Sequence, residues 1–500
     1  MSTAVQAKPV PAQALSLPEH RGAFYGGAWH EPKSARYADV LNPGTGGSLG
    51  RVAECGAADA AAAVAAAKQA FADWRRVLPL ERAKLLRRIA ELLRRHAEEL
   101  AMIDAADCGN PVSEMVGDAM VAAAQMEFFA GLVTEMKGAS IPMGPDVVNF
   151  SVREPLGVVV RIIPFNHPFM FCAGKSAAPL AAGNTVIVKP PEQAPLSSLR
   201  LAELIGALLP PGVFNVVPGG REVGNALASH PVVAKVALIG SVPTGRAVMR
   251  AAADTLKPVT LELGGKNALI AYPDADPDEV AQGVIAGMNF TWCGQSCGST
   301  SRAFLHADIH DAVLERIKAR IRHYRPGVPT DPATTMGAII SKPQFDRVMS
   351  YIAAGRSEGA TLIAGGGPPA DPALAGGLYI EPTVFADVRP DMRIAREEIF
   401  GPVLCVLRWD DEQRMLAEVN AVEYGLTCSI WTNDLSTAHR SAMAVEAGYV
   451  WINEVGKHFL GAPFGGVKQS GIGREECLEE MLRFTQEKNI HVKLRGDRRR

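Results

Sequence analysis

The chain has 500 residues and a formal net charge of −2, from 51 lysines and arginines against 53 aspartates and glutamates. This length predicts two or three domains, and an apolar content of 48% is enough to fill their cores. With charges nearly balanced and no basic face in the sequence, a nucleic-acid or anionic-membrane partner is not expected.

The first 20 residues have neither the charged start nor the continuous apolar core of a signal peptide, and they predict a flexible N-terminal arm. Because no stretch of about 18 uninterrupted apolar residues occurs, no membrane span is expected. Eight cysteines are scattered without a secretory signal, which favours reduced thiols and a cytoplasmic location over a disulfide framework. The terminal RGDRRR predicts a solvated basic tail.

The first part of the chain predicts helices. Residues 57–74 are rich in alanine, and residues 79–100 place leucine and isoleucine at helical spacing with charges on the other face. A third helix is expected over residues 112–136.

From residue 152 onward, β-branched runs alternate with helical patterns. This alternation predicts a parallel, doubly wound sheet with helices on both faces. The expected strands are residues 157–163, 185–190, 212–219 and 233–241, with a last run over 258–272. The expected helices are residues 173–180, 197–209, 223–230 and 244–254.

A second α/β series is expected after Asp274, with a strand at 303–309 and a helix at 313–323. The tail FTQEKNIHVKL alternates apolar and polar residues, which predicts a strand at the end of the chain. A lone strand must pair with something, and we expect a neighbouring subunit to provide the partner.

Two cysteines, Cys293 and Cys297, lie four residues apart among glycines and small hydroxyl residues. As half of a zinc site they lack a second pair of ligands, so no metal site is expected. Buried thiols that fill space remain one interpretation. The other is that Cys297 is a nucleophile, because small neighbours let a substrate approach and its own N–H can stabilise an oxyanion.

Two further polar residues stand where chemistry is plausible. Glu262 lies in the apolar strand VTLEL, where burial raises a carboxyl pKa towards that of a general base, unless Lys266 pairs with it. Asn166 lies between two prolines in IPFNHP, where it is either a rigid amide donor for an oxyanion or a turn residue that caps its own backbone.

The segment VALIGSVPTGRAV reads as a strand, then Gly240 and Ser241, then a helix that begins near Gly245. Such a helix N-terminus can bind an anion. The segment does not match the GxGxxG dinucleotide fingerprint, so an ordinary strand–helix turn remains possible from this motif alone.

Taken together, these motifs resemble the aldehyde dehydrogenase superfamily, in its NAD(P)-dependent, non-acylating type. The resemblance covers roughly Ala23 to Leu494. Seven motifs occur in the family's order: PFN, GNTVIVKPPEQAP, GSVPTG, LELGGK, GQSC, EEIFGPV and PFGGVKQSGIGRE.

The resemblance implies an α/β fold with a Rossmann-like cofactor domain, an α/β catalytic domain and a small β oligomerisation element. The cofactor domain would comprise residues 21–130 and 153–262, and the catalytic domain residues 263–462, including the nucleophile. Residues 131–152 and 480–495 would form the oligomerisation element of a homodimer or homotetramer.

The resemblance also implies a mechanism. Cys297, and not Cys293, would attack a small-molecule aldehyde, with the Asn166 amide and the Cys297 N–H holding the oxyanion. Hydride transfer to NAD would convert the thiohemiacetal into a thioester, and water activated by Glu262 would release the carboxylic acid.

For the cofactor, the resemblance places Lys189 and Glu192 at the adenosine ribose, Ser241 at the pyrophosphate and Glu398 at the nicotinamide ribose. Glu192 favours NAD over NADP, which remains possible, because a carboxylate repels a 2′-phosphate. The full implied set is Ile163, Pro164, Phe165, Lys189, Glu192, Gly224, Gly240, Ser241, Gly245, Leu263, Glu398 and Phe400.

Glu475 resembles a second acidic residue of the family, with either a proton-relay role or a structural ion pair. The implied substrate pocket comprises Phe171, Gly174, Thr291, Ser296, His458 and Phe464, with Phe459 next to His458. Gly174 and Thr291 are small, which predicts room for an aromatic or otherwise bulky aldehyde, and His458 would add a polar group at the rim.

Two other functions compete with this one. In a CoA-acylating aldehyde dehydrogenase, CoA instead of water would resolve the thioester, but such enzymes usually lack the glutamate found here at 262. A non-catalytic oligomeric protein could also keep this fold, but it would be expected to lose Cys297, Glu262 or Asn166, and all three are present.

Overall fold

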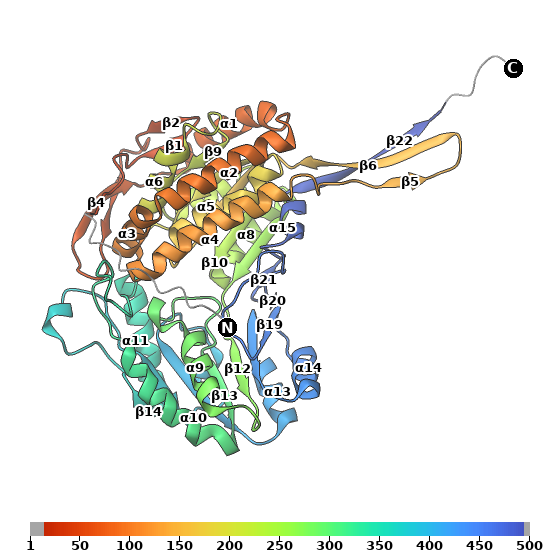
Figure 1. The fold of residues 1–500 in the computed structure, drawn as a ribbon. Helices are drawn as coiled ribbons and strands as arrows, with labels where there is room; N and C mark the ends of the chain where they lie inside the picture. Colours follow the sequence, from red (N-terminus) through yellow and green to blue (C-terminus); the bar gives the residue numbers. More distant parts are fainter. Residues whose placement is uncertain (1–14, 495–500) are drawn as a thin grey trace, which may run out of the picture.

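The computed structural model describes residues 15–494, which leaves most of the expected N-terminal arm and the RGDRRR tail outside the described residues. The chain forms two α/β lobes, one above the other in Figure 1, and a β arm that projects from the upper lobe. The expected combination of a Rossmann-like lobe, a second α/β lobe and a small β element is confirmed.

The upper lobe contains an eight-stranded sheet in the order β2-β1-β9-β8-β7-β10-β11-β21. The five strands from β9 to β11 run parallel, as predicted, and antiparallel strands extend both edges. The strands are β1 (Ala23–Tyr25), β2 (Ala28–His30), β7 (Val158–Ile162), β8 (Thr185–Lys189), β9 (Phe214–Val216), β10 (Val233–Gly240), β11 (Val259–Leu263) and β21 (Gly471–Ile472).

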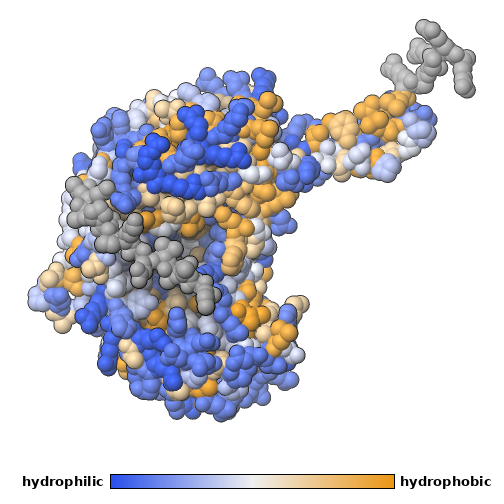
Figure 2. All heavy atoms as spheres, viewed as in Figure 1, coloured by the Kyte–Doolittle hydropathy of each residue, from blue (hydrophilic) through white to orange (hydrophobic). Residues whose placement is uncertain are grey.

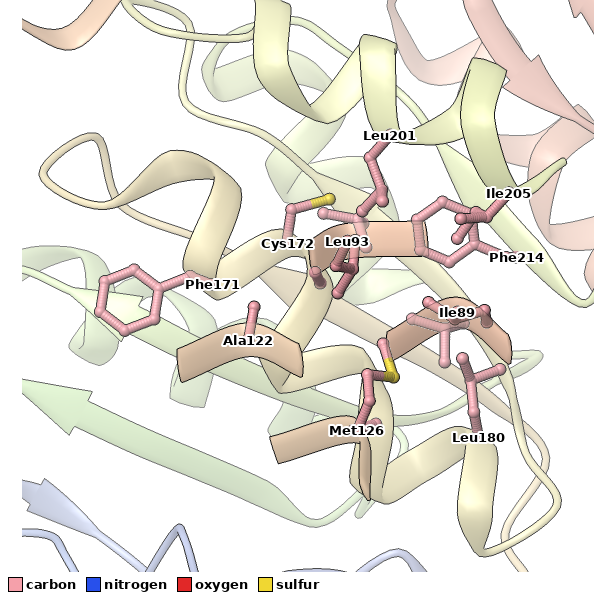
Figure 3. Close-up of a cluster of buried hydrophobic side chains, with 14 of the residues drawn as sticks. Ile89, Leu93, Ala122, Met126, Phe171, Cys172, Leu180, Leu201, Ile205 and Phe214 are labelled. Carbon is pink, nitrogen blue, oxygen red and sulfur yellow. The ribbon is translucent and has the colours of Figure 1, made fainter. Parts of the chain in front are cut away.

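Helices cover both faces of this sheet, and alternate residues of its strands pack into two different hydrophobic cores. Val159 packs into the core under α2 to α6, and its neighbours Val158 and Val160 pack into the core under α1, α7 and α8. Figure 3 shows the first of these cores, between α2, α4, α5 and α6. The helices are α1 (Ala57–Trp74), α2 (Pro79–Arg95), α3 (Ala97–Cys108), α4 (Val112–Gly131), α5 (Pro168–Ala181), α6 (Leu196–Ile205), α7 (Arg221–Ser229) and α8 (Val242–Ala253).

Two helix predictions need correction. The single helix expected over residues 79–100 is two helices, because the backbone leaves the helical region at His96 (φ −102°, ψ 16°). The His96 ring bonds to Glu99 in the first turn of α3, at 2.7 Å, where acidic residues favour a helix start. The helix expected to reach residue 136 ends at Gly131.

The lower lobe contains a seven-stranded sheet in the order β14-β15-β16-β13-β12-β18-β19, parallel except at β14. Its strands are β12 (Ala268–Ala271), β13 (Arg302–His306), β14 (Thr361–Ala364), β15 (Thr383–Ala386), β16 (Val403–Trp409), β18 (Thr427–Trp431) and β19 (Tyr449–Ile452). Its helices are α9 (Pro277–Met288), α10 (Ala307–Arg320), α11 (Lys342–Ser357), α12 (Arg393–Arg396), α13 (Glu412–Asn420) and α14 (Leu435–Ala444). The chain crosses between the lobes from β11 to β12, so the expected run 258–272 is two strands in two sheets.

The arm is a three-stranded antiparallel sheet of β5 (Ser140–Pro142), β6 (Val147–Pro155) and β22 (Thr485–Lys493). The predicted terminal strand is present, and one of its edges pairs along its whole length with β6 of the same chain. Its other edge is unpaired within the described residues, so pairing with a neighbouring subunit stays a prediction. The first part of the expected oligomerisation element, residues 131–152, contributes β5 and most of β6, which continues to residue 155.

The arm carries apolar side chains on its surface, which Figure 2 shows as a hydrophobic region near its tip. Exposed ones are Ile141, Met143, Val148, Val492 and Leu494. In the sheet order, β22 and β5 are the outer strands.

Short elements complete the fold: β3 (Tyr37–Leu41) with β4 (Ser48–Ala53), β17 (Tyr424–Gly425) with β20 (Val467–Lys468), and α15 (Leu478–Leu482). Over residues 15–494, no helix has both the length and the apolar character needed to cross a membrane. In the same range, no three His, Cys, Asp or Glu side chains gather as a metal site would require.

Candidate active site

Residues from distant parts of the chain meet at a cavity of about 310 Å³ between the lobes. Glu262 reaches it from β11, Asn166 from the loop between β7 and α5, and Cys297 from the loop before β13. Glu398 and Phe400 line the same cavity from the segment after α12. The structure therefore brings together all three residues predicted to be catalytic.

The two cysteines of the GQSC segment differ in exposure. Cys293 is fully buried in the core of the lower lobe, whereas Cys297 is half-buried and lines the cavity. The carbonyl oxygen of Cys297 accepts a hydrogen bond from Asn267 Nδ2 at 2.7 Å, which fixes the loop. The interpretation as space-filling thiols therefore fits Cys293, and an accessible thiol remains at Cys297.

Glu262 is only 4% exposed, and its carboxyl lines the same cavity as Cys297. Burial raises the pKa of the Glu262 carboxyl to about 8, and the neighbouring Cys297 thiol offsets part of that rise. Burial and the neighbouring Glu262 charge raise the pKa of the Cys297 thiol well above its usual value. The alternative ion pair with Lys266 is not formed, because neither Glu262 Oε1 nor Lys266 Nζ has a hydrogen-bond partner.

Asn166 lines the catalytic cavity, and its backbone is fixed by a hydrogen bond from a neighbouring segment. Its backbone carbonyl accepts a hydrogen bond from Asn110 Nδ2 at 2.6 Å, while its own side-chain Oδ1 is buried without a partner. The alternative of a turn asparagine that caps its own backbone has no support in these contacts. The amide is free to bind a ligand in the cavity.

A larger cleft of about 1010 Å³ runs along the carboxyl ends of the upper-lobe strands. In open α/β sheets this is the edge where dinucleotides bind. Burial lowers the pKa of Lys189 to about 8, and Ser241 caps α8 by accepting the Thr244 N–H at 3.4 Å. Of the expected cofactor residues, those that line the cleft are Ile163, Pro164, Phe165, Lys189, Glu192, Gly224, Gly240 and Ser241.

Gly245 and Leu263, also expected at the cofactor, are not among the residues that line either cavity. They pack against each other: a Cβ at Gly245 would lie 2.8 Å from Leu263 Cδ1. A glycine here lets α8 approach β11 closely, so the pair shapes the cleft through packing.

Glu398 explains the first of the two glycines of LELGGK, Gly264, whereas a Cβ at Gly265 would meet Asn267 and the carbonyl of Cys297. The Glu398 carboxylate accepts the Gly265 N–H at 3.1 Å, and a Cβ at Gly264 would clash with it. Burial raises the pKa of the Glu398 carboxyl to about 7. The Phe400 ring meets the Phe165 ring edge-on at 5.6 Å, at the junction of cleft and cavity.

The expected substrate pocket is only partly assembled. Gly174 adds no room, contrary to expectation, because a Cβ there would clash with the carboxamide of Gln125. Thr291 lines a separate cavity of about 580 Å³ with Glu114 and Tyr324, away from Cys297. Ser296 is half-buried beside Cys297.

At the expected rim, His458 is bound to a carboxylate rather than free. Its Nδ1 lies 3.1 Å from Glu476 Oε2, and its ring lies 4.3 Å from the Phe464 ring. Phe459 points into solvent, with 63% exposure. Phe171 is buried in α5, with its ring edge-on to His167 at 5.8 Å.

Glu475 belongs to a buried ion cluster that the sequence analysis did not identify. Its carboxylate lies 3.1 Å from Arg161 and 3.0 Å from Lys175, and Glu480 lies 2.9 Å from the same arginine. Burial opposes the charged form, yet Lys175 and Arg161 outweigh it and hold the pKa of the Glu475 carboxyl below its usual value. The ion-pair interpretation of Glu475 is the one that fits.

The signal for this cluster was present in the sequence. Arg161 interrupts the apolar run GVVVRII, and Lys175 lies in the apolar helix α5. A charged side chain that is buried in an apolar core needs an opposite charge beside it. Sequence alone did not identify the partners, which lie about 300 residues away.

A nucleotide cleft that ends at a thiol and a carboxylate is an arrangement suited to an oxidoreductase, and comparison with known proteins identifies which kind. The model of the aldehyde dehydrogenase family matches residues 29–490. Aldehyde dehydrogenase tropH of Talaromyces stipitatus is 53% identical over 489 residues, covering 96% of this chain and 95% of the relative. Betaine aldehyde dehydrogenase of Brucella melitensis is 44% identical, over 94% of this chain and 97% of the relative.

Solved structures agree. An NAD⁺ complex of aldehyde dehydrogenase from Bacillus cereus has a TM-score of 0.92 at 38% identity, covering 95% of this chain and 97% of that one. AldA, the indole-3-acetaldehyde dehydrogenase of P. syringae, in complex with NAD⁺ and IAA, has a TM-score of 0.93 at 38% identity, covering 97% and 98%. The chain belongs to the aldehyde dehydrogenase family. It is an NAD(P)-dependent aldehyde dehydrogenase, an enzyme that oxidises an aldehyde to the acid.

The ion cluster predicts a strong effect of Glu475→Gln on stability. Removing this charge leaves Arg161 and Lys175 undercompensated in the core, which should cost about 3–5 kcal/mol of unfolding free energy at pH 7. Because the pKa of Glu475 is lowered in the fold, this contribution is present above the unfolded pKa and is lost as pH falls below about 4.3. Guanidinium unfolding at pH 7 and pH 4 measures both effects.

Glu487→Gln is the matched control, because Glu487 faces Arg153 at 3.4 Å on the exposed arm. It should cost less than about 1 kcal/mol. Equal small losses in the two variants would contradict a structural role for the cluster.

Proposed function

We propose that the enzyme works through Cys297 as nucleophile, Glu262 as general base and Asn166 as oxyanion donor. The observation that carries this proposal is that Glu262, Asn166 and the half-buried Cys297 line one cavity, which adjoins the nucleotide cleft. Glu262 takes the thiol proton, and the thiolate attacks the aldehyde carbon. The Asn166 amide and the Cys297 N–H stabilise the resulting oxyanion.

Bound NAD supplies the hydride acceptor for the oxidation of this adduct to a thioester. The thiol proton passes from Glu262 to solvent, so that Glu262 can then remove a proton from the water that attacks the thioester carbonyl. The adduct expels the Cys297 sulfur, which takes this proton as the carboxylic acid leaves. Glu262 also weighs against CoA acylation, since a water-activating base lies next to the thiol. The orphaned Asn166 Oδ1 and Glu262 Oε1 are consistent with a cavity that receives polar ligands.

Cys297→Ala should abolish NADH formation. Glu262→Gln should slow the single-turnover burst, because the thiol loses its proton acceptor, and should make the following steady state about 10²–10⁴-fold slower, because water is no longer activated. Glu262 must be ionised to act as a base, so the steady-state rate of the native enzyme should rise with pH through about 8. Rapid-mixing absorbance at 340 nm measures both phases.

Cys293→Ala is the control, since Cys293 is buried away from the cavity and its removal should leave the burst intact. An inactive Cys293→Ala beside an active Cys297→Ala would refute the assignment. CoA-dependent acceleration would instead favour the acylating alternative.

The cofactor is NAD, held by the residues of the cleft, with Glu192 facing the adenosine ribose. The Gly224 position has open space around it, as close approach of a dinucleotide requires. The use of NAD is consistent with the NAD⁺ complexes among the structural neighbours.

Glu192→Gln should raise kcat/KM for NADP relative to NAD by about tenfold, because it removes a charge that repels the 2′-phosphate. Glu222→Gln is the control: Glu222 lines the same cleft but is paired with Arg36 at 2.9 Å. An unchanged NADP/NAD ratio in Glu192→Gln, or an equal change in both variants, would refute the role of Glu192.

The domain division follows the lobes: a cofactor domain of residues 21–130 and 153–262, a catalytic domain of 263–462 and an oligomerisation element of 131–152 and 480–495. The arm provides the contact of a homodimer or homotetramer, because its apolar side chains and unpaired strand edges need a partner. The eight unpaired cysteines are consistent with a cytoplasmic location.

Ile141→Lys combined with Val148→Lys should reduce the mass in solution to that of a smaller assembly, since both residues lie exposed on the arm. Light scattering after size exclusion measures this. Leu256→Lys, at a 91% exposed leucine on the upper lobe, should leave the mass unchanged. A monomeric native protein would refute the proposal.

The substrate is an aromatic or otherwise bulky aldehyde. Support comes from the indole-3-acetaldehyde dehydrogenase among the structural neighbours, and no longer from the size of Gly174. A clear preference for acetaldehyde or propionaldehyde over benzaldehydes would contradict it.

A further inference from the structure

Two helices next to the proposed reaction centre meet along a polar seam. Asp118 and Gln125 lie seven residues apart on α4, which places them on one helix face. They contact residues of α5 and its N-cap that are also seven apart: Asp118 Oδ2 binds His167 Nδ1 at 2.7 Å, and the Gln125 carboxamide lies against Gly174. Between them Ala122 comes within 3.6 Å of the position of a Cβ at Gly174.

The Gln125 carboxamide is a buried polar group without a partner. The residue is 2% exposed, and its Oε1 has no hydrogen bond. It fits only because residue 174 is a glycine, since any Cβ there would clash with it. A buried amide without a hydrogen-bond partner costs stability. Its presence in a closely packed position therefore points to a ligand that supplies the missing hydrogen bond.

One end of the seam lies next to the catalytic cavity, because His167 directly follows Asn166, which lines that cavity. The His167 ring is 4.6 Å from Trp292 on the loop that leads to Cys297. Phe171, one turn along α5, lies at the edge of the hydrophobic cluster drawn in Figure 3, away from Phe214.

The loop between β19 and β20 lies at the other end of the seam. A Cβ at Gly461 would lie 3.9 Å from Phe128, one helical turn beyond Gln125 on α4. The same loop carries His458 and Phe464, which the family resemblance assigns to the pocket. Gln125 therefore lies between the N-cap of α5 and this loop, on the face of α4 that meets α5.

We propose that Gln125 is a specificity-determining residue, whose carboxamide binds a hydroxyl group on the aldehyde substrate. The inference rests on the proposed function of Cys297. A hydroxyl donates to Oε1 and accepts from Nε2, so it satisfies both ends of the amide. Carboxylated aldehydes are disfavoured, because Asp118 and Glu114 add negative charge on the same helix.

The test compares substituents of equal size. The native enzyme should oxidise at least one of the three hydroxybenzaldehydes about tenfold or more better, in kcat/KM, than the corresponding tolualdehyde, whose methyl group cannot hydrogen-bond. Gln125→Met should bring that ratio close to one while the tolualdehyde rate is kept. Gly174→Ala should have the same effect, because it displaces the carboxamide.

Met126→Leu is the control: it changes the adjacent residue, which packs in the hydrophobic core (Figure 3), and should leave the ratio unchanged. If Gln125→Met lowers both rates equally, or if Met126→Leu also lowers the ratio, Gln125 has a structural role only and the proposal is overturned.

Binding to Cys297→Ala separates this proposal from the mechanism, because this variant holds the aldehyde without turnover. Calorimetry should show the preferred hydroxybenzaldehyde bound about tenfold more tightly than its tolualdehyde, and the difference should vanish in Cys297→Ala combined with Gln125→Met. Equal binding of the two aldehydes would overturn the proposal and leave the role of Cys297 standing. Full turnover by Cys297→Ala would overturn the mechanism, and the role of Gln125 would then depend on the substituent ratio alone.

Discussion

The pairing of the C-terminal segment with the first sheet is the constraint on which the site depends. After the second lobe the chain returns to the first, where β21 pairs antiparallel with β11 and sets Gly471 opposite Glu262. A few residues later, Glu475 and Glu480 pair with Arg161 of β7 in the core. Buried ion pairs add little net stability but penalise any register that leaves a charge alone. The proposed base is thus held in place by a sequence more than 200 residues away.

The same segment ties the two sides of the catalytic cavity together. Lys175 of α5 contacts Glu475 and Glu476, and Glu476 also binds His458 at the rim. On the opposite side, Gly264 after β11 makes room for Glu398, which reaches in from the second lobe and accepts the Gly265 N–H. Because Asn166 and Glu262 come from the first lobe and Cys297 from the second, the geometry of the site depends on how the lobes pack.

Local patterns predicted much of this fold, and contacts between distant segments account for what they missed. The alanine-rich helix α1 has the bounds predicted for it, and the alternating strands of the first sheet follow the β-branched runs, because periodicity reports local burial. The break at His96 is accompanied by a side-chain bond to Glu99, which periodicity does not register. Pairing of β22 with β6, the partners of Arg161 and the contact of Gln125 with Gly174 all join residues far apart in sequence. Family motifs located Cys297, Glu262 and Asn166, but not contacts such as that of Gln125 with Gly174, because a motif does not show which side chain fills the space beside it.

Burial and the charges around Glu262 set its pKa and thereby how well it can act as a base near neutral pH. Burial is the main cause that raises the pKa of Glu262 to about 8, and the nearby charges of Glu475 and Glu398 contribute to this rise. Lys175 opposes this rise, and it is itself kept charged by the two carboxylates it contacts. A base with too low a pKa would take a proton from water poorly, and one with too high a pKa would be protonated and inactive at neutral pH. The buried ion cluster therefore does more than hold the chain in register: its Glu475 raises the pKa of the proposed base and its Lys175 lowers it, so the two members act on Glu262 in opposite directions.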